Sequence, residues 1–137
     1  MNHSESAPPT CGLYTLKIQA QFCAAHALRD YPGDCRRLHG HNWKVETEVE
    51  AKVLNDIGIA IDFKAIKAAT RTLADSLDHR FLNDIEPFDR INPSAENLAA
   101  WFYRQLSKIL NGSGVSVSAV TIWETDTACV RYKEIAA

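Results

Sequence analysis

Apolar and polar residues alternate along four stretches of the chain, and alternation with a period of two residues is typical of β-strands. The stretches cover residues 16–22, 42–51, 115–123 and 128–132. In the second of them, apolar side chains and one threonine occupy the odd positions, and lysine and glutamate occupy most of the even ones. Because side chains of a strand point alternately to its two faces, each stretch is expected to bury one face only.

Two stretches between the second and third predicted strands repeat apolar residues every three to four positions, the spacing of one helical face. The first predicted helix begins after Asp62, a suitable N-cap, and ends near Asp78 and His79. The second begins near residues 93–96, where a proline suits the first turn, and ends at residues 111–112. The order of the predicted elements is therefore ββααββ.

This order predicts the α+β class, with an antiparallel four-stranded sheet and two helices on one face of the sheet. Two helices are too few to cover both faces of these strands. One sheet face and both sheet edges are therefore left without cover, and an exposed edge strand tends to pair with another chain. We expect neighbouring subunits of a homo-oligomer to close these surfaces.

The length of 137 residues, 46% of them hydrophobic, suits one domain. We place that domain at residues 13–137. Residues 1–12 are polar, contain Pro8 and Pro9, and are interpreted as a disordered lead-in rather than a signal peptide. The balance of 15 basic against 17 acidic residues favours neither nucleic acid nor an anionic membrane as a partner. No apolar run approaches the roughly 20 residues of a membrane span.

The four cysteines are widely and irregularly spaced, at positions 11, 23, 35 and 129. A domain of this size does not depend on disulfides, so we expect free thiols and a reducing, cytoplasmic compartment. Cys23 and Cys129 lie in strand-like segments and are interpreted as small hydrophobic residues. Cys35 lies between Asp34 and two arginines in a predicted loop, a setting that favours the thiolate.

Three of the five histidines, His26, His39 and His41, fall within sixteen positions. Because His39 and His41 are separated by one residue at the start of a predicted strand, their imidazoles should lie on the same side. His26 lies just beyond the preceding predicted strand and can join them. Three neutral imidazoles with an open fourth position are typical of catalytic zinc. In the alternative interpretations, His26 caps a strand end beside two surface histidines, or Cys35 completes a closed structural site.

Three further candidates are weak when each is taken alone. Asp78 and His79 adjoin at the end of the first predicted helix, where a histidine beside a solvated carboxylate is common. Glu124 ends a predicted strand, where a carboxylate usually faces water. Ser94 lies where the second helix begins, and its simplest role is that of a helix start.

Six motifs follow one another along the chain. They are Ala24-Ala25-His26, Cys35-Arg-Arg-Leu-His39-Gly-His41-Asn42, Ile61-Asp62-Phe63, Leu77-Asp78-His79 with Leu82-Asn83, Asn92-Pro93-Ser94-Ala95-Glu96-Asn97, and Glu124-Thr125. In this order they resemble the family of 6-pyruvoyltetrahydropterin and 6-carboxytetrahydropterin synthases, which is built on the tunnelling fold. The resemblance extends from about Phe22 to Tyr132, and the ββααββ order is that of the family's subunit.

The resemblance implies that His26, His39 and His41 hold Zn²⁺. The ion would coordinate the side-chain hydroxyls of a dihydropterin and lower their pKa. Cys35 would be the general base or proton shuttle, with its thiolate supported by the nearby metal.

The resemblance also implies roles for the weaker candidates. Asp78 would orient His79, and His79 would relay protons on the far side of the substrate. Glu124 would accept two hydrogen bonds from the pterin ring, and Ser94 would line the same pocket. The family assembles trimers, two of which stack into a hexamer with the sites at subunit interfaces.

Three residues separate Cys35 from His39. This short gap resembles the bacterial 6-carboxytetrahydropterin synthases of queuosine synthesis, whereas the pyruvoyl-forming enzymes have a longer one. The resemblance thus implies a lyase that converts 7,8-dihydroneopterin triphosphate to 6-carboxy-5,6,7,8-tetrahydropterin, acetaldehyde and triphosphate. The alternative within the family is elimination of triphosphate to 6-pyruvoyltetrahydropterin. The alternative of another class is a non-catalytic, zinc-stabilised assembly module in which Cys35 closes the metal site.

Overall fold

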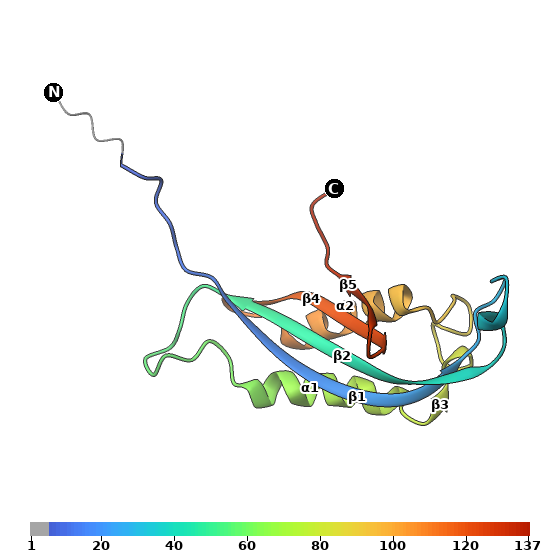
Figure 1. Cartoon of the computed structure of the whole chain (residues 1–137). Helices are drawn as coiled ribbons and strands as arrows, with labels where there is room; N and C mark the ends of the chain where they lie inside the picture. Colours follow the sequence, from blue (N-terminus) through green and yellow to red (C-terminus); the bar gives the residue numbers. More distant parts are fainter. Residues whose placement is uncertain (1–5) are drawn as a thin grey trace.

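The computed structural model describes residues 6–137 (Figure 1). Residues 6–12 form no helix or strand and are exposed; the remainder of the expected lead-in, residues 1–5, lies outside the described residues. In chain order, the elements are β1 (Tyr14–His26), η1 (Asp34–Arg36), β2 (His39–Ala51), α1 (Phe63–Leu77), β3 (Arg80–Phe81), η2 (Leu82–Asp84), α2 (Ala95–Leu110), β4 (Val115–Thr125) and β5 (Ala128–Tyr132).

The strands form one sheet in the order β3-β1-β2-β4-β5. The four strands predicted from the period-two pattern are present and pair antiparallel, which confirms the α+β class. The pattern does not predict β3, which has two residues and runs parallel to β1, beside Ala24 and Ala25. Two residues are too few to show a periodicity. This strand places the chain that follows α1 against the end of β1.

The helices cover the sheet face to which the odd residues of β2 point. Trp43, Val45 and Val49 are completely buried on this face, and the ring of Phe22 on β1 stacks on Trp43 at a centroid distance of 6.1 Å. From the two helices, the same core contains Ile66, Leu77, Leu98, Phe102 and Leu106. Burial of these large apolar side chains is the main stabilising contribution to the fold, and it fixes the end of the sheet where β1 passes to β2.

The opposite face of the sheet has no helix over it among the described residues. Glu48 on β2 points to this open face, yet its side chain is only 4% exposed. Arg131 on β5 donates two hydrogen bonds to the Glu48 carboxylate, at 2.8 and 3.1 Å, and Lys17 on β1 lies 3.9 Å from it. These contacts hold the pKa of Glu48 below its usual range. The prediction that the chain leaves one sheet face without helices is confirmed for residues 6–137.

Both long helices begin where the sequence predicts. Oδ1 of Asp62 accepts a hydrogen bond from the Lys64 backbone N–H at 2.8 Å, and Oγ of Ser94 accepts one from the Asn97 backbone N–H at 3.1 Å. Each side chain therefore serves as an N-cap. Over the part of the chain that the structure covers, neither helix combines the length and the hydropathy that a membrane span requires.

Cys23 and Cys129, interpreted from the sequence as small hydrophobic residues, are both exposed and lie outside the core. Cys23 points to the open face of the sheet, where its thiol donates a hydrogen bond to Oδ1 of Asn42 at 3.0 Å. Cysteine suits either face of a strand, so strand periodicity alone does not decide its burial. The expectation of free thiols is confirmed for all four cysteines.

Candidate metal centre

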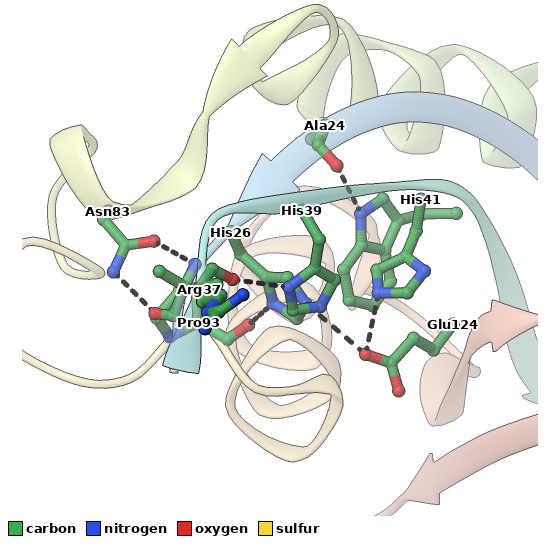
Figure 2. A network of polar contacts seen from close by, with 10 residues as sticks. Ala24, His26, Arg37, His39, His41, Asn83, Pro93 and Glu124 are labelled. Atoms are coloured by element: carbon green, nitrogen blue, oxygen red, sulfur yellow. Dashed lines mark hydrogen bonds and ion pairs between the residues drawn. The ribbon is translucent and has the colours of Figure 1, made fainter. Parts of the chain in front are cut away.

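Three histidine side chains meet where β1 ends and β2 begins (Figure 2). His26 is the last residue of β1 and pairs with His39, the first residue of β2, while His41 lies two positions further along. The ring centroids are 4.5 Å apart for His26 and His39, 5.1 Å for His26 and His41, and 4.8 Å for His39 and His41. The structure thus brings together the three histidines singled out from the sequence.

Two of these histidines are oriented by backbone carbonyl groups. Nδ1 of His26 donates a hydrogen bond to the carbonyl oxygen of Pro93, and Nδ1 of His39 donates one to the carbonyl oxygen of Arg37, each at 2.7 Å. A carbonyl only accepts, so each neutral ring carries its proton on Nδ1 and leaves a lone pair on Nε2. The two Nε2 atoms lie 2.9 Å apart. Two facing lone pairs repel each other unless a cation lies beside both.

Glu124, near the end of β4, the strand that pairs with β2, points toward the histidines (Figure 2). Its Oε1 lies 3.4 Å from Nε2 of His26 and 3.2 Å from Nε2 of His41, and the latter nitrogen is buried without a hydrogen bond. Zinc–ligand bonds of about 2.0–2.1 Å place tetrahedral ligand atoms about 3.3 Å apart. The four donor atoms, all within 4.8 Å of one another, therefore fit a single metal ion.

Burial favours the neutral form of two of the imidazoles. His26 is completely buried, and desolvation lowers its pKa more than the hydrogen bond to Pro93 raises it. Desolvation also lowers the pKa of His41, against the opposing effect of the Glu124 carboxylate. Near pH 7 both rings are neutral, which is the form that binds a metal.

Trp43 lies beside the cluster, although the sequence pattern assigns it only to a strand. Its ring is 5.0 Å from that of His26 and 5.1 Å from that of His41, and its Nε1 donates a hydrogen bond to the carbonyl oxygen of Ala24 at 3.2 Å. The rigid indole restricts the orientations of both imidazoles. The carbonyl acceptors of Arg37 and Pro93 are also missed by sequence reasoning, since a backbone group leaves no residue-specific signal.

Cys35 lies in η1, in the loop between β1 and β2, and is exposed. Its carbonyl oxygen accepts a hydrogen bond from the Leu28 backbone N–H at 3.0 Å, which closes the loop. Among the described residues, the cluster of candidate ligands contains Glu124 and not Cys35. The geometry therefore does not favour a site closed by this thiol.

Asp78 and His79 form a hydrogen-bonded pair just after α1. Nδ1 of His79 lies 2.9 Å from Oδ2 of Asp78, whose Oδ1 accepts a hydrogen bond from the Cys23 backbone N–H at 2.8 Å. That backbone hydrogen bond is the main cause that lowers the pKa of Asp78. The His79 side chain is 80% exposed, and its residue has a left-handed φ of 57°. The pair is thus fastened to the outer edge of β1 with the imidazole facing outward.

His41 and His79 border the same surface hollow of about 520 Å³. Its other lining residues include Cys23, Gly40, Asn42 and Arg80. Ser94 lies apart from this lining and acts as the N-cap of α2, directly after the Pro93 carbonyl that holds His26. Within one chain, the candidate residues therefore divide into a histidine cluster, an exposed loop thiol and an outward-facing aspartate–histidine pair.

Comparison with known proteins gives consistent matches. The sequence model of the family described as 6-pyruvoyl tetrahydropterin synthase matches residues 15–135. A 6-carboxy-5,6,7,8-tetrahydropterin synthase of Synechocystis is 35% identical over 126 residues, which cover 88% of this chain and 93% of that protein. A dihydroneopterin monophosphate aldolase of Pyrococcus furiosus is 34% identical over 106 residues, covering 77% and 85%. The solved 6-pyruvoyl tetrahydropterin synthase of Caenorhabditis elegans superposes with a TM-score of 0.81 at 25% identity, covering 91% and 98%.

Proposed function

The chain belongs to the 6-pyruvoyl tetrahydropterin synthase family, and on that premise we propose that it is a zinc-dependent lyase acting on 7,8-dihydroneopterin triphosphate. In the proposed reaction, substrate and water give 6-carboxy-5,6,7,8-tetrahydropterin, acetaldehyde and triphosphate. The observation that carries the proposal is the convergence of three imidazole Nε2 atoms, two of them on rings held by carbonyl groups. This arrangement presents neutral ligands to one ion.

His26, His39 and His41 would hold the zinc. When bound, Zn²⁺ polarises the hydroxyl groups of the substrate side chain and lowers their pKa. The Cys35 thiolate would then take a proton from the carbon beside such a hydroxyl. Proton abstraction at this position begins both the carboxy-forming and the pyruvoyl-forming reaction, so the same residues serve either outcome.

Glu124 would anchor the pterin by accepting hydrogen bonds from the amino-pyrimidine edge of the ring, and Ser94 would lie near the same pocket. His79 would relay protons on the far side of the substrate. Asp78 would support it, because the carboxylate accepts a hydrogen bond from Nδ1–H of His79 and so leaves Nε2 to exchange protons with the substrate. The exposure of His79 fits contact with a neighbouring subunit.

The proposed assembly is a homo-oligomer, a trimer or hexamer with the sites at subunit interfaces. β5 is one edge of the sheet, and β3 covers only two residues of β1 at the other. Most of the outer edge of β1 is therefore available to pair with an edge strand of another copy.

Two observations favour the carboxy product over the pyruvoyl product. The gap between Cys35 and His39 is three residues. In addition, two relatives at 35% and 32% identity are named 6-carboxy-5,6,7,8-tetrahydropterin synthases. We therefore propose that the chain acts in deazapurine synthesis of the queuosine type. Elimination of triphosphate to 6-pyruvoyltetrahydropterin is the second candidate, because the solved structure with a TM-score of 0.81 is a 6-pyruvoyl tetrahydropterin synthase.

The variant Cys35→Ala tests the enzyme against a zinc-stabilised assembly module. A general base contributes about 10²–10⁴-fold to a rate. We expect Cys35→Ala to retain its zinc, measured by mass spectrometry of the metal, and its fold, measured by circular dichroism. Its turnover of 7,8-dihydroneopterin triphosphate should fall by about 10²–10⁴-fold. Cys129→Ala is the matched control and should keep wild-type turnover. Loss of zinc or unfolding in Cys35→Ala alone would instead support the structural module.

A further inference from the structure

The loop that carries Cys35 is tied to the rest of the chain by two hydrogen bonds, one from the Leu28 backbone N–H to the Cys35 carbonyl and one from Nδ1 of His39 to the Arg37 carbonyl. Residues 30–38 are exposed, and the Leu28 backbone N–H donates the hydrogen bond to the Cys35 carbonyl at 3.0 Å. The other backbone hydrogen bonds at η1 connect Arg36 to Gly33 and Arg37 to Asp34, within the loop itself. Of these two hydrogen bonds, only the one from Leu28 is made by Cys35 itself, so the position of Leu28 helps to set the position of the Cys35 thiol relative to the histidines.

Two asparagine side chains hold the residues on either side of Leu28. Oδ1 of Asn83 accepts a hydrogen bond from the Ala27 N–H at 3.0 Å, and its Nδ2 donates to the Ala27 carbonyl at 2.8 Å (Figure 2). Asn92 makes the same pair of contacts with Arg29, at 2.8 and 2.9 Å. Each amide thus satisfies both backbone groups of one residue, as a neighbouring β-strand would.

The segment of residues 83–93, which supplies these amides, is held by further hydrogen bonds and also contacts the metal cluster. Nδ2 of Asn97, in the first turn of α2, donates to the Asn92 carbonyl at 2.8 Å, and the Arg29 guanidinium donates to the Phe88 carbonyl at 2.9 Å. Pro93, which follows Asn92, accepts the hydrogen bond from Nδ1 of His26. A single segment therefore sets the orientation of a candidate metal ligand and the position of the Cys35 loop.

We propose that Asn83 and Asn92 are positioning residues that fix the Cys35 thiol relative to the histidine cluster. The inference rests on the proposed function only in giving Cys35 a role in turnover. The amide group is required because each contact uses a donor and an acceptor of one side chain. Aspartate has the same shape but no donor, so its carboxylate would face the carbonyl oxygen of Ala27 or Arg29 and repel it.

The test compares Asn83→Ala, Asn92→Ala and Asn92→Asp with Asn55→Ala in the zinc-loaded full chain. Oδ1 of Asn55 accepts hydrogen bonds from the Ile57 and Ile59 backbone N–H groups, at 3.1 and 2.9 Å, in the loop at the opposite end of β2. Asn55→Ala is therefore the matched control, because it removes side-chain hydrogen bonds from a loop that lies away from Cys35. For each variant we measure the kinetics of pterin turnover and the zinc content. We also measure the pH profile of Cys35 alkylation, using peptide mass spectrometry to follow the alkylation.

A displaced base reduces turnover by about 10- to 100-fold. We expect the Asn83 and Asn92 variants to lose this factor in kcat with little change in KM, to keep zinc, and to show a shifted pH profile of Cys35 alkylation. Hydrogen exchange at the Leu28 N–H should be faster. Asn55→Ala should lower Tm and change none of these quantities.

Wild-type kcat and an unshifted alkylation profile in folded Asn83 and Asn92 variants would overturn the inference. If one alanine variant fails to fold, the other variants give the same readouts. If the wild-type chain does not convert the pterin, the proposed function fails, but alkylation and hydrogen exchange still decide whether the asparagines position Cys35.

Discussion

His41 and Glu124, two members of the cluster of candidate ligands, differ in burial and in their need for a cation. Nε2 of His41 is buried and has no hydrogen bond, so a cation is the partner that would satisfy it. Glu124 is about one-third exposed and lies at the open side of the cluster. Three imidazoles can hold zinc without it, which would leave the carboxylate free for its proposed hydrogen bonds to the pterin.

We therefore predict different results for His41→Ala and Glu124→Ala. In His41→Ala, the affinity for zinc should fall by about 10-fold or more, because the variant lacks one of the metal ligands. Glu124→Ala should keep its zinc and bind the pterin more weakly, as measured by titration calorimetry with a dihydropterin. If Glu124→Ala lost zinc to the same extent as His41→Ala, the carboxylate would be a ligand and the anchor assignment would be wrong.

Glu48 and Arg131 form an ion pair on the open face of the sheet. Hydrogen bonds from Arg131 keep the pKa of Glu48 below its ordinary value of 4.5. The pair therefore contributes its full stability above pH 4.5, and this contribution is lost as the pH falls through the lower pKa of the folded state.

Glu48→Gln should have a lower Tm than wild type at pH 7 and a flatter decline of Tm below pH 4.5, measured by scanning calorimetry. Glu50→Gln, at the next glutamate of β2, is the control and should follow the wild-type curve. A Glu48→Gln curve parallel to that of wild type at every pH would contradict the assignment.

Among the elements, α2 begins with an N-cap that lies next to the metal cluster. Oγ of Ser94 accepts a hydrogen bond from the Asn97 N–H, and replacement of such a cap by alanine costs about 1 kcal/mol. Ser94→Ala should lower the free energy of unfolding by about this amount in urea. Ser107, whose hydroxyl bonds to the Tyr103 carbonyl inside the same helix, is the control, and Ser107→Ala should change stability less. Equal losses in the two variants would contradict the capping role.

The sequence predicts best those elements in which the pattern of apolar positions repeats over many residues. β1, β2 and both helices repeat apolar positions over many residues, and the alternation along β2 is enough to predict that His39 and His41 lie on one side. β3 and η2 are too short to show a period. The partners of the site residues are also hidden, because the contacts of Pro93 with His26 and of Asn83 with Ala27 join segments more than 50 positions apart. Asn83 and Pro93 fall within motifs that carry the family resemblance, but the local sequence does not show which residues they contact.

For the whole molecule, the open face and edges of the sheet predict assembly. A single chain exposes the charged face that contains Glu48 and Arg131, the edge strand β5 and most of the outer edge of β1. It also leaves His79 facing outward. Closure of several sheets into a ring would cover the edges and bring His79 of one copy towards the site of another.

We therefore expect light scattering coupled to size exclusion to give a mass corresponding to three or six chains of 15.3 kDa. Turnover should fall on dilution in step with the loss of the oligomer, because the proposed sites lie at subunit interfaces. A fully active monomer would contradict the proposed interface sites, although it would leave the metal cluster within one chain unaffected.

The identity of the product tests the account most directly. The zinc-loaded protein is incubated with 7,8-dihydroneopterin triphosphate, the pterin products are identified by mass spectrometry, and released acetaldehyde is trapped. We predict 6-carboxy-5,6,7,8-tetrahydropterin together with an equal amount of acetaldehyde, and formation of both slowed by about 10²–10⁴-fold in Cys35→Ala. A pyruvoyl product would keep the residue assignments but refute the significance of the short gap between Cys35 and His39. No conversion, with zinc bound and the oligomer intact, would contradict the proposal that the chain is a pterin lyase acting on this substrate.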